Sequence, residues 1–136
     1  MQGFVAYPSM PKLIGTEVNA ALKRLKACGT TGIKSWEEND IAGRFLVQPI
    51  LDKISSSQVL IADVSTLNFN VAFEIGYAIG KSKRVLLVKN TLVQSDFALF
   101  SKLGIFDTLG YETYRNGTEH AAIIEKSKDT LSLIHI

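Results

Sequence analysis

The stretch VLIADV, residues 59–64, is the clearest strand signal in the chain, because it is nearly continuous in apolar residues. A central strand of a parallel sheet has this composition, since helices cover both of its faces. A polar turn follows, and residues 70–80 then carry apolar side chains at helical spacing. The segment 59–80 therefore predicts a strand, a turn and a helix of an α/β domain.

On both sides of this segment, apolar runs of strand length alternate with stretches of helical spacing. The other predicted strands are 3–7, 33–36 and 84–88, with a fifth inside 105–114. The other predicted helices are 17–26, 45–54, 96–103 and 118–128, with Pro49 at or near the start of the second. Such alternation predicts a parallel sheet with helices on both faces. Right-handed crossovers then favour a flavodoxin-like, doubly wound α/β sheet of five strands in the order 2-1-3-4-5.

The length of 136 residues fits one domain spanning 1–136. With 46% hydrophobic and 21% charged residues, the chain can bury a core. It ends in an apolar tail, residues 131–136. Such a tail must dock or stay exposed, so we expect either a docked last segment or a domain cut from a longer chain.

Charge and composition exclude several classes of function. The net charge of +2, with no run of basic residues, argues against nucleic acid as a partner. No apolar stretch approaches the ~18 residues of a membrane span, so no membrane partner is expected. A lone cysteine, Cys28, fits a reducing, cytoplasmic location and is expected to be a small buried hydrophobe. No His/Cys set has metal-ligand spacing, so neither a metal nor another cofactor is expected.

Topology predicts where a ligand binds. In a doubly wound sheet the site lies outside the carboxyl ends of the strands, near the turns after strands one, two and three. The third turn is rich in polar side chains: Asp63, Ser65, Asn68 and Asn70. Asn70 is a candidate helix cap. Glu74 lies one turn into the helix, where its position alone fits a functional carboxylate and a plain surface residue about equally.

The motif ADVSxxNxNVxFEIGYA, residues 62–78, followed by GKSKRV at 80–85, resembles the signature of the nucleoside 2-deoxyribosyltransferase family. The opening segment FVAYPS, residues 4–9, is similar to that family's first strand and turn. The resemblance covers roughly residues 3 to 90. It implies cleavage or transfer at the N-glycosidic bond of a nucleoside or nucleotide, with Glu74 as the nucleophile at the anomeric carbon. It also implies a homo-oligomer whose subunits complete each other's sites.

The resemblance also assigns roles to the residues around Glu74. Asn68, where many members carry aspartate, would contact the sugar, and Asp63 would shape the site or orient the loop. Trp36 is expected either to stack on a base or to be a core or rim residue. The other residues that we expect at the substrate are Tyr7, Pro8, Ser9, Asp40, Ser65 and Asn70.

Two other functions remain open on the sequence alone. The architecture is similar to that of Toll/interleukin-1 receptor domains that cleave NAD, which place a catalytic glutamate on the helix after the third strand; this reading makes Glu74 part of an NAD hydrolase in a signalling or defence effector. The other reading is a non-catalytic module, which either binds a nucleotide-like ligand or serves assembly. An assembly module predicts an exposed apolar patch, with Phe97, Phe100 or the tail as candidates.

Overall fold

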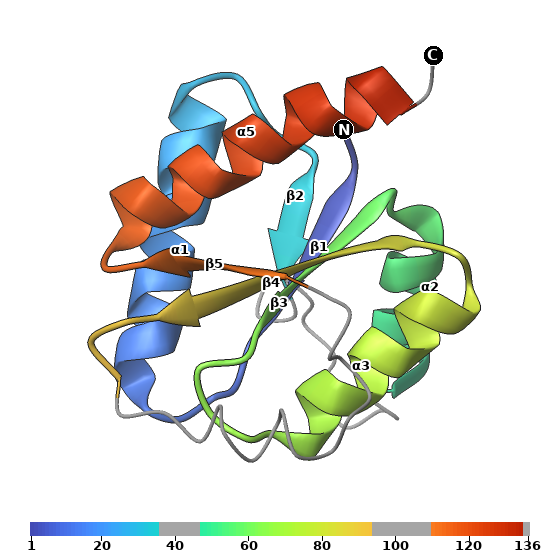
Figure 1. Cartoon of the computed structure of the whole chain (residues 1–136), viewed down its shortest axis with the longest axis horizontal. Coiled ribbons are helices and arrows are strands. Elements are labelled where there is room, and N and C mark those ends of the chain that lie inside the picture. The colour runs from blue at the N-terminus through green and yellow to red at the C-terminus, as the bar shows by residue number, and fades with distance from the viewer. Residues whose placement is uncertain (36–46, 94–109, 135–136) are drawn as a thin grey trace.

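The computed structural model of the chain describes residues 1–35, 47–93 and 110–134. Five parallel strands form one sheet in the order β2-β1-β3-β4-β5, which confirms the predicted doubly wound, flavodoxin-like topology (Figure 1). The strands are β1 (Gly3–Ala6), β2 (Ile33–Ser35), β3 (Val59–Asp63), β4 (Arg84–Asn90) and β5 (Tyr111–Tyr114). The described helices are α1 (Lys12–Ala27), α2 (Val47–Ser56), α3 (Phe69–Gly80) and α5 (Gly117–Ile134).

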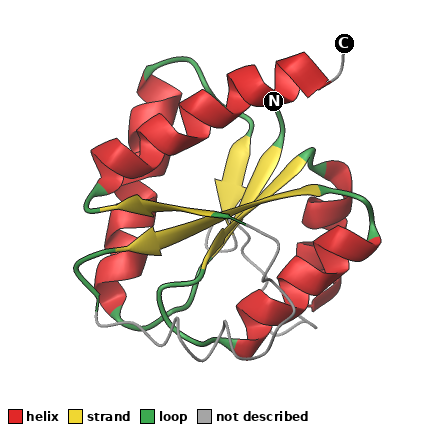
Figure 2. Cartoon of the chain, in the orientation of Figure 1, coloured by secondary structure: helices red, strands yellow, loops and turns green. Residues whose placement is uncertain are grey.

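Helices cover both faces of the sheet, as predicted (Figure 2). One core lies between the sheet, α1 and α5, and includes Ile14, Leu25 and Ile124. The other lies between the sheet, α2 and α3, and includes Ile54 and Ile75. Every residue of β3 is buried, as its continuous apolar sequence requires for a central strand.

Several predicted boundaries were wrong by a few residues. Helix α1 begins at Lys12 rather than Glu17, because Ile14 extends the buried stripe one turn toward the amino end. Helix α5 continues to Ile134, so part of the apolar tail is helical. Pro49 lies in the first turn of α2, where its missing N–H costs no hydrogen bond. The predicted helix 96–103, with Phe97 and Phe100, lies outside the described residues.

The expected burial of Cys28 was wrong. Its side chain is exposed, because α1 ends at Ala27 and Cys28 forms the helix cap, beyond the last buried position, Leu25. Gly29 follows with φ +89°, a conformation that glycine adopts without strain.

The crossing of α1 and α5 depends on one glycine. A Cβ at Gly117 would lie 2.6 Å from the Cβ of Ala20 and 2.9 Å from the backbone nitrogen of Ala21. The backbone N–H of Gly117 donates to the carboxylate of Glu17 at 2.6 Å, which places a negative charge at the amino end of α5.

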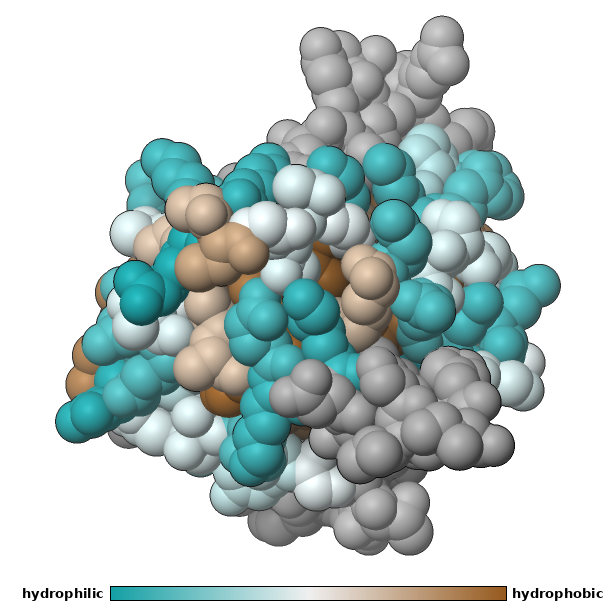
Figure 3. Space-filling view, turned by 90° about the horizontal axis from the view of Figure 1, so that it is seen from above, coloured by the Kyte–Doolittle hydropathy of each residue, from teal (hydrophilic) through white to brown (hydrophobic). Residues whose placement is uncertain are grey.

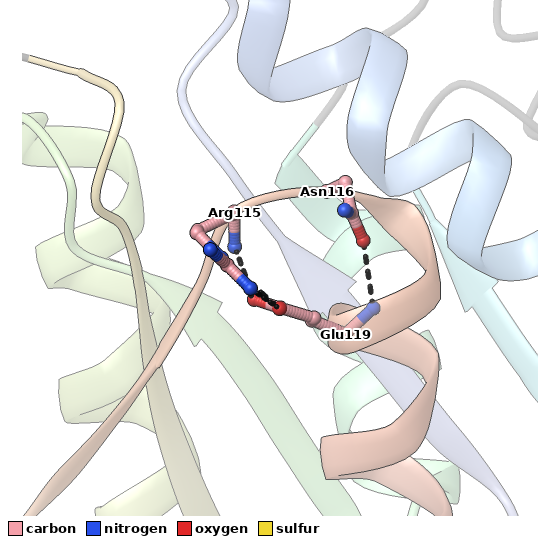
Figure 4. Close-up of polar contacts among 3 residues, drawn as sticks. All are labelled: Arg115, Asn116 and Glu119. Carbon is pink, nitrogen blue, oxygen red and sulfur yellow. Dashed lines mark hydrogen bonds and ion pairs between the residues drawn. The ribbon is translucent and has the colours of Figure 1, made fainter.

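The start of α5 is capped by its neighbours in sequence (Figure 4). The Asn116 side chain accepts a hydrogen bond from the backbone of Glu119 at 3.0 Å, and the Glu119 carboxylate accepts from the backbone and guanidinium of Arg115. These contacts satisfy donors that the first turn of a helix leaves free.

The molecule has a largely hydrophilic surface on the side of α5. Figure 3 shows hydrophilic side chains surrounding smaller apolar areas on that face. None of the described helices is long and apolar enough to cross a membrane.

Candidate functional site

Buried polar residues end four of the five strands. Ser35, Asp63, Asn90 and Tyr114 are the last residues of β2, β3, β4 and β5, and each is 0% exposed. Because the strands are parallel, all four lie at the same edge of the sheet. This is the edge at which the topology predicted a ligand site.

Asp63 is the centre of a buried hydrogen-bond network. Its carboxylate accepts a bond from the backbone N–H of Ser65 at 2.8 Å and a second from the hydroxyl of Tyr114. Burial raises the pKa of Asp63 above its ordinary value, although the bonds from Ser65 and Tyr114 oppose the rise. Since Asp63 is fully buried and already bonded, its geometry fits the orientation of the loop rather than contact with a ligand.

One hydrogen bond ties the turn after β3 to the end of β4, and another lies within the turn after β4. The Ser65 hydroxyl accepts from the backbone N–H of Asn90 at 2.7 Å, and the Asn90 side-chain oxygen accepts from Leu92 at 2.8 Å. Sequence reasoning missed Asn90. The available signal was a polar residue directly after the apolar run of β4.

The turn from Asp63 leads into α3, and Asn68 starts that helix. Its side-chain oxygen accepts from the backbone N–H of Val71 at 3.0 Å. The prediction of Asn70 as the cap was therefore wrong: the helix begins at Phe69, and Asn70 lies exposed in its first turn. With the oxygen of Asn68 used by the cap, its amide N–H groups are what this side chain can offer to a sugar hydroxyl.

Glu74 lies in the second turn of α3 and is half-buried. It shares a side of the helix with Tyr77, one turn further along, whose hydroxyl hydrogen-bonds Ser55 of α2 at 2.9 Å. Burial raises the pKa of Glu74 to about 7, and no described residue donates a hydrogen bond to it or pairs with its charge. Near neutral pH the carboxyl group is therefore present in both protonation states, which suits a group that must react.

The turn after β1 lies beside the turn after β3. Ala6 pairs with Ala62 across the sheet, so Tyr7 and Pro8 follow β1 at the level where Asp63 ends β3. Tyr7 and Pro8 are buried, and Ser9 is exposed. The structure thus brings these predicted residues to one edge, while Trp36 and Asp40 lie outside the described residues.

His120 of α5 was given no role by the sequence. It is 0% exposed, and its ring packs edge-on against Tyr114 with centroids 4.6 Å apart. Neither ring nitrogen has a hydrogen-bond partner within the described part of the chain. Burial lowers the pKa of His120 to about 4, so the ring is neutral and supports Tyr114 through packing.

Known proteins add no assignment to this geometry. A scan against models of protein families and a search of curated proteins find no match for the chain. No group of three or more potential metal ligands occurs within residues 1–35, 47–93 and 110–134.

Proposed function

We propose that this chain cleaves, or transfers a group at, the N-glycosidic bond of a nucleoside or nucleotide, with Glu74 as the nucleophile. The observation that carries the proposal is the state of Glu74. The carboxylate of Glu74 is half-buried, and burial raises its pKa to about 7. It has no partner among the described residues. It sits on the helix that follows the central strand, next to the edge where doubly wound sheets bind ligands.

The chemistry follows from an ionised Glu74. A carboxylate oxygen attacks the anomeric carbon, the bond between that carbon and the base nitrogen breaks, and its electron pair goes to the base. The sugar is then held as an ester on Glu74. Attack by water on the anomeric carbon gives hydrolysis, with one proton released, whereas attack by a second base gives transfer. Either step restores the carboxylate.

The other side chains have positioning roles in this proposal. Asp63, held by Ser65 and Tyr114, fixes the turn that leads to Asn68. Asn68 then sets the start of α3 and offers its amide to the sugar. The resemblance of residues 62–78 to the deoxyribosyltransferase signature supports this assignment, with the residues of the turn after β1 near the base or sugar.

NAD is the second candidate substrate, because its leaving group needs no proton. A nucleobase departs more readily when an acid protonates it, and the carboxyl groups in the segment 63–74 are those of Asp63 and Glu74. Asp63 is fully buried and already accepts two hydrogen bonds. In NAD the cationic nicotinamide ring is itself the leaving group: it takes the electron pair of the bond to the anomeric carbon, departs as neutral nicotinamide and needs no proton. A site with one reactive carboxylate is therefore sufficient for it.

The test is a chromatographic product assay on the wild type, Glu74→Gln and the control Glu112→Gln, which changes an exposed glutamate of β5. Each protein is incubated at high concentration with NAD, deoxynucleosides and deoxynucleoside monophosphates. We expect free base or nicotinamide from the wild type and the control, and a loss of at least about 100-fold with Glu74→Gln. No product from the wild type on any substrate would overturn the proposal in favour of a binding or assembly module.

A further inference from the structure

Tyr77 bridges α3 and α2 on the side of α3 that carries Glu74. Its hydroxyl hydrogen-bonds the hydroxyl of Ser55 at 2.9 Å, and its half-buried ring packs against the core between the sheet, α2 and α3. The two helices lie side by side on one face of the sheet (Figure 1). Because each leads from one parallel strand to another, both run in the same direction. The contact between Ser55 and Tyr77 therefore fixes their register.

This register places Glu74 in a sheltered position. Glu74 lies one turn before Tyr77 on α3, and Leu51 lies one turn before Ser55 on α2, so Glu74 and Leu51 are at the same level. Leu51 is apolar and half-buried. Side chains of a helix lean toward its amino end, so a ring at position 77 covers the turn on which Glu74 lies. The side chain of Leu51 and the ring of Tyr77 therefore flank the carboxylate of Glu74.

Lys81 contacts the ring of Tyr77 as well. It follows Tyr77 by four residues on α3, and its ammonium group lies 5.7 Å from the centre of the ring. The face of a tyrosine ring attracts a cation at this distance. The ring is thus held at two points, by the hydroxyl of Ser55 at its edge and by the charge of Lys81 over its face.

We propose that Tyr77 is a positioning residue for Glu74, whose ring, anchored by Ser55 and Lys81, shields the carboxylate of Glu74 from water. A carboxylate shielded from water interacts more strongly with the positive charge that develops at the anomeric carbon. The effect on the reaction rests on the proposed function, whereas the shielding does not.

The electrostatics of Glu74 agree with such shielding. Burial alone raises its pKa to about 7, and no neighbouring charge contributes to the rise. Besides Tyr77, the ionisable groups on α2, on α3 and on the strands beneath them are Lys34, Asp52, Lys53, Asp63, Lys81, Arg84 and Lys89. Removal of the ring that keeps water from Glu74 is therefore expected to lower this pKa.

NMR titration of the side-chain carboxyl carbons tests the shielding. The signal of Glu74 is the one missing from Glu74→Gln. Tyr77→Ala is expected to lower the pKa of Glu74 by about one unit or more, toward its ordinary value of 4.5. The control Tyr111→Ala removes an exposed ring from β5 and is expected to leave that pKa unchanged. An unchanged pKa in a Tyr77→Ala protein with a native circular dichroism spectrum, or an equal fall in Tyr111→Ala, would overturn the proposal.

Two milder variants test the anchor, and they decide the question even if Tyr77→Ala does not fold. Tyr77→Phe and Ser55→Ala each remove the hydrogen bond between the two helices and keep the ring. Each is expected to lower the pKa of Glu74 by the same fraction of a unit. The double variant is expected to lower it no further, because both changes remove one shared contact. A pKa of Glu74 that neither variant changes, or effects that add in the double variant, would contradict the anchored ring.

The pH dependence of the reaction separates this inference from the proposed function. With the substrate that the product assay identifies, kcat/KM of the wild type is expected to rise as the pH passes about 7, since Glu74 must be ionised to attack. In Tyr77→Ala the rise is expected at a lower pH, displaced by the shift that NMR measures. If the wild type forms no product, the proposed function fails, and the NMR titration still decides whether Tyr77 shields Glu74. A rise that stays at the wild-type pH in Tyr77→Ala would overturn the inference.

Discussion

The carboxylate of Glu74 reduces the stability of the folded protein, and an amide of the same shape removes this effect. Burial raises the pKa of Glu74 from its ordinary 4.5 to about 7, so the folded state binds the proton more tightly than the unfolded state. Stability falls with pH wherever the native state binds more protons. The contribution of Glu74 is therefore fully present below pH 4.5 and is lost as the pH rises to 7, and we predict that Glu74→Gln is more stable than the wild type at pH 8.

The size of this effect follows from the same values. The difference between 4.5 and about 7 corresponds to at most about 3 kcal/mol. Because the side chain is only half-buried, water screens part of the effect. We therefore expect the gain in the free energy of unfolding to reach about 1–3 kcal/mol above pH 7, and to be near zero at about pH 4.

Urea unfolding followed by circular dichroism between about pH 4 and pH 8 measures this difference. Taking the difference between Glu74→Gln and the wild type removes the contributions of the other titrating groups, such as Asp63 and His120, which both proteins share. The control Glu112→Gln makes the same chemical change at an exposed position and supplies the baseline for the comparison. A difference that stays constant with pH, or an amide variant less stable than the wild type at pH 8, would refute the view of Glu74 as a sheltered carboxylate.

Four further substitutions test the packing of the fold. Tyr114→Phe removes the hydroxyl that donates to buried Asp63, and urea unfolding is expected to show a loss of about 1–3 kcal/mol. His120→Phe removes the buried imidazole, whose pKa burial lowers from 6.5 to about 4. This group costs the wild type stability as the pH falls from 6.5 to 4, and the variant lacks that loss. The acid-unfolding midpoint of His120→Phe is therefore expected at a lower pH than that of the wild type. Gly117→Ala forces a Cβ to within 2.6 Å of α1 and is expected to lower the thermal midpoint by several degrees, whereas Gly80→Ala, with open space around it, is expected to leave the midpoint unchanged or raise it.

The sequence predicted the sheet because its signals are local and strong. The run 59–64 is buried as a central strand, and the alternation of elements leaves few alternatives for the order 2-1-3-4-5. The predicted position of the candidate site followed from topology alone. The polar residues at the end of β3 and in the turn after it could be recognised from the sequence as candidate functional residues.

What the sequence could not predict depends on contacts between distant residues. The bond from Tyr114 to Asp63 joins residues 51 positions apart, and no local pattern signals it. The choice of Asn68 over Asn70 as the cap depends on where the backbone turns into α3, since both side chains can cap. The exposure of Cys28 likewise depends on where α1 ends relative to its buried stripe.

The proposed mechanism requires Glu74 to form a bond to the anomeric carbon. Intact-protein mass spectrometry after rapid acid quenching tests it, using the substrate from which the product assay detects release of a base or nicotinamide. We predict a mass increase equal to the glycosyl group on the wild type, located by peptide mapping on residues 69–80 and absent from Glu74→Gln. Product release by Glu74→Gln at the wild-type rate, or an adduct on any other residue, would contradict it.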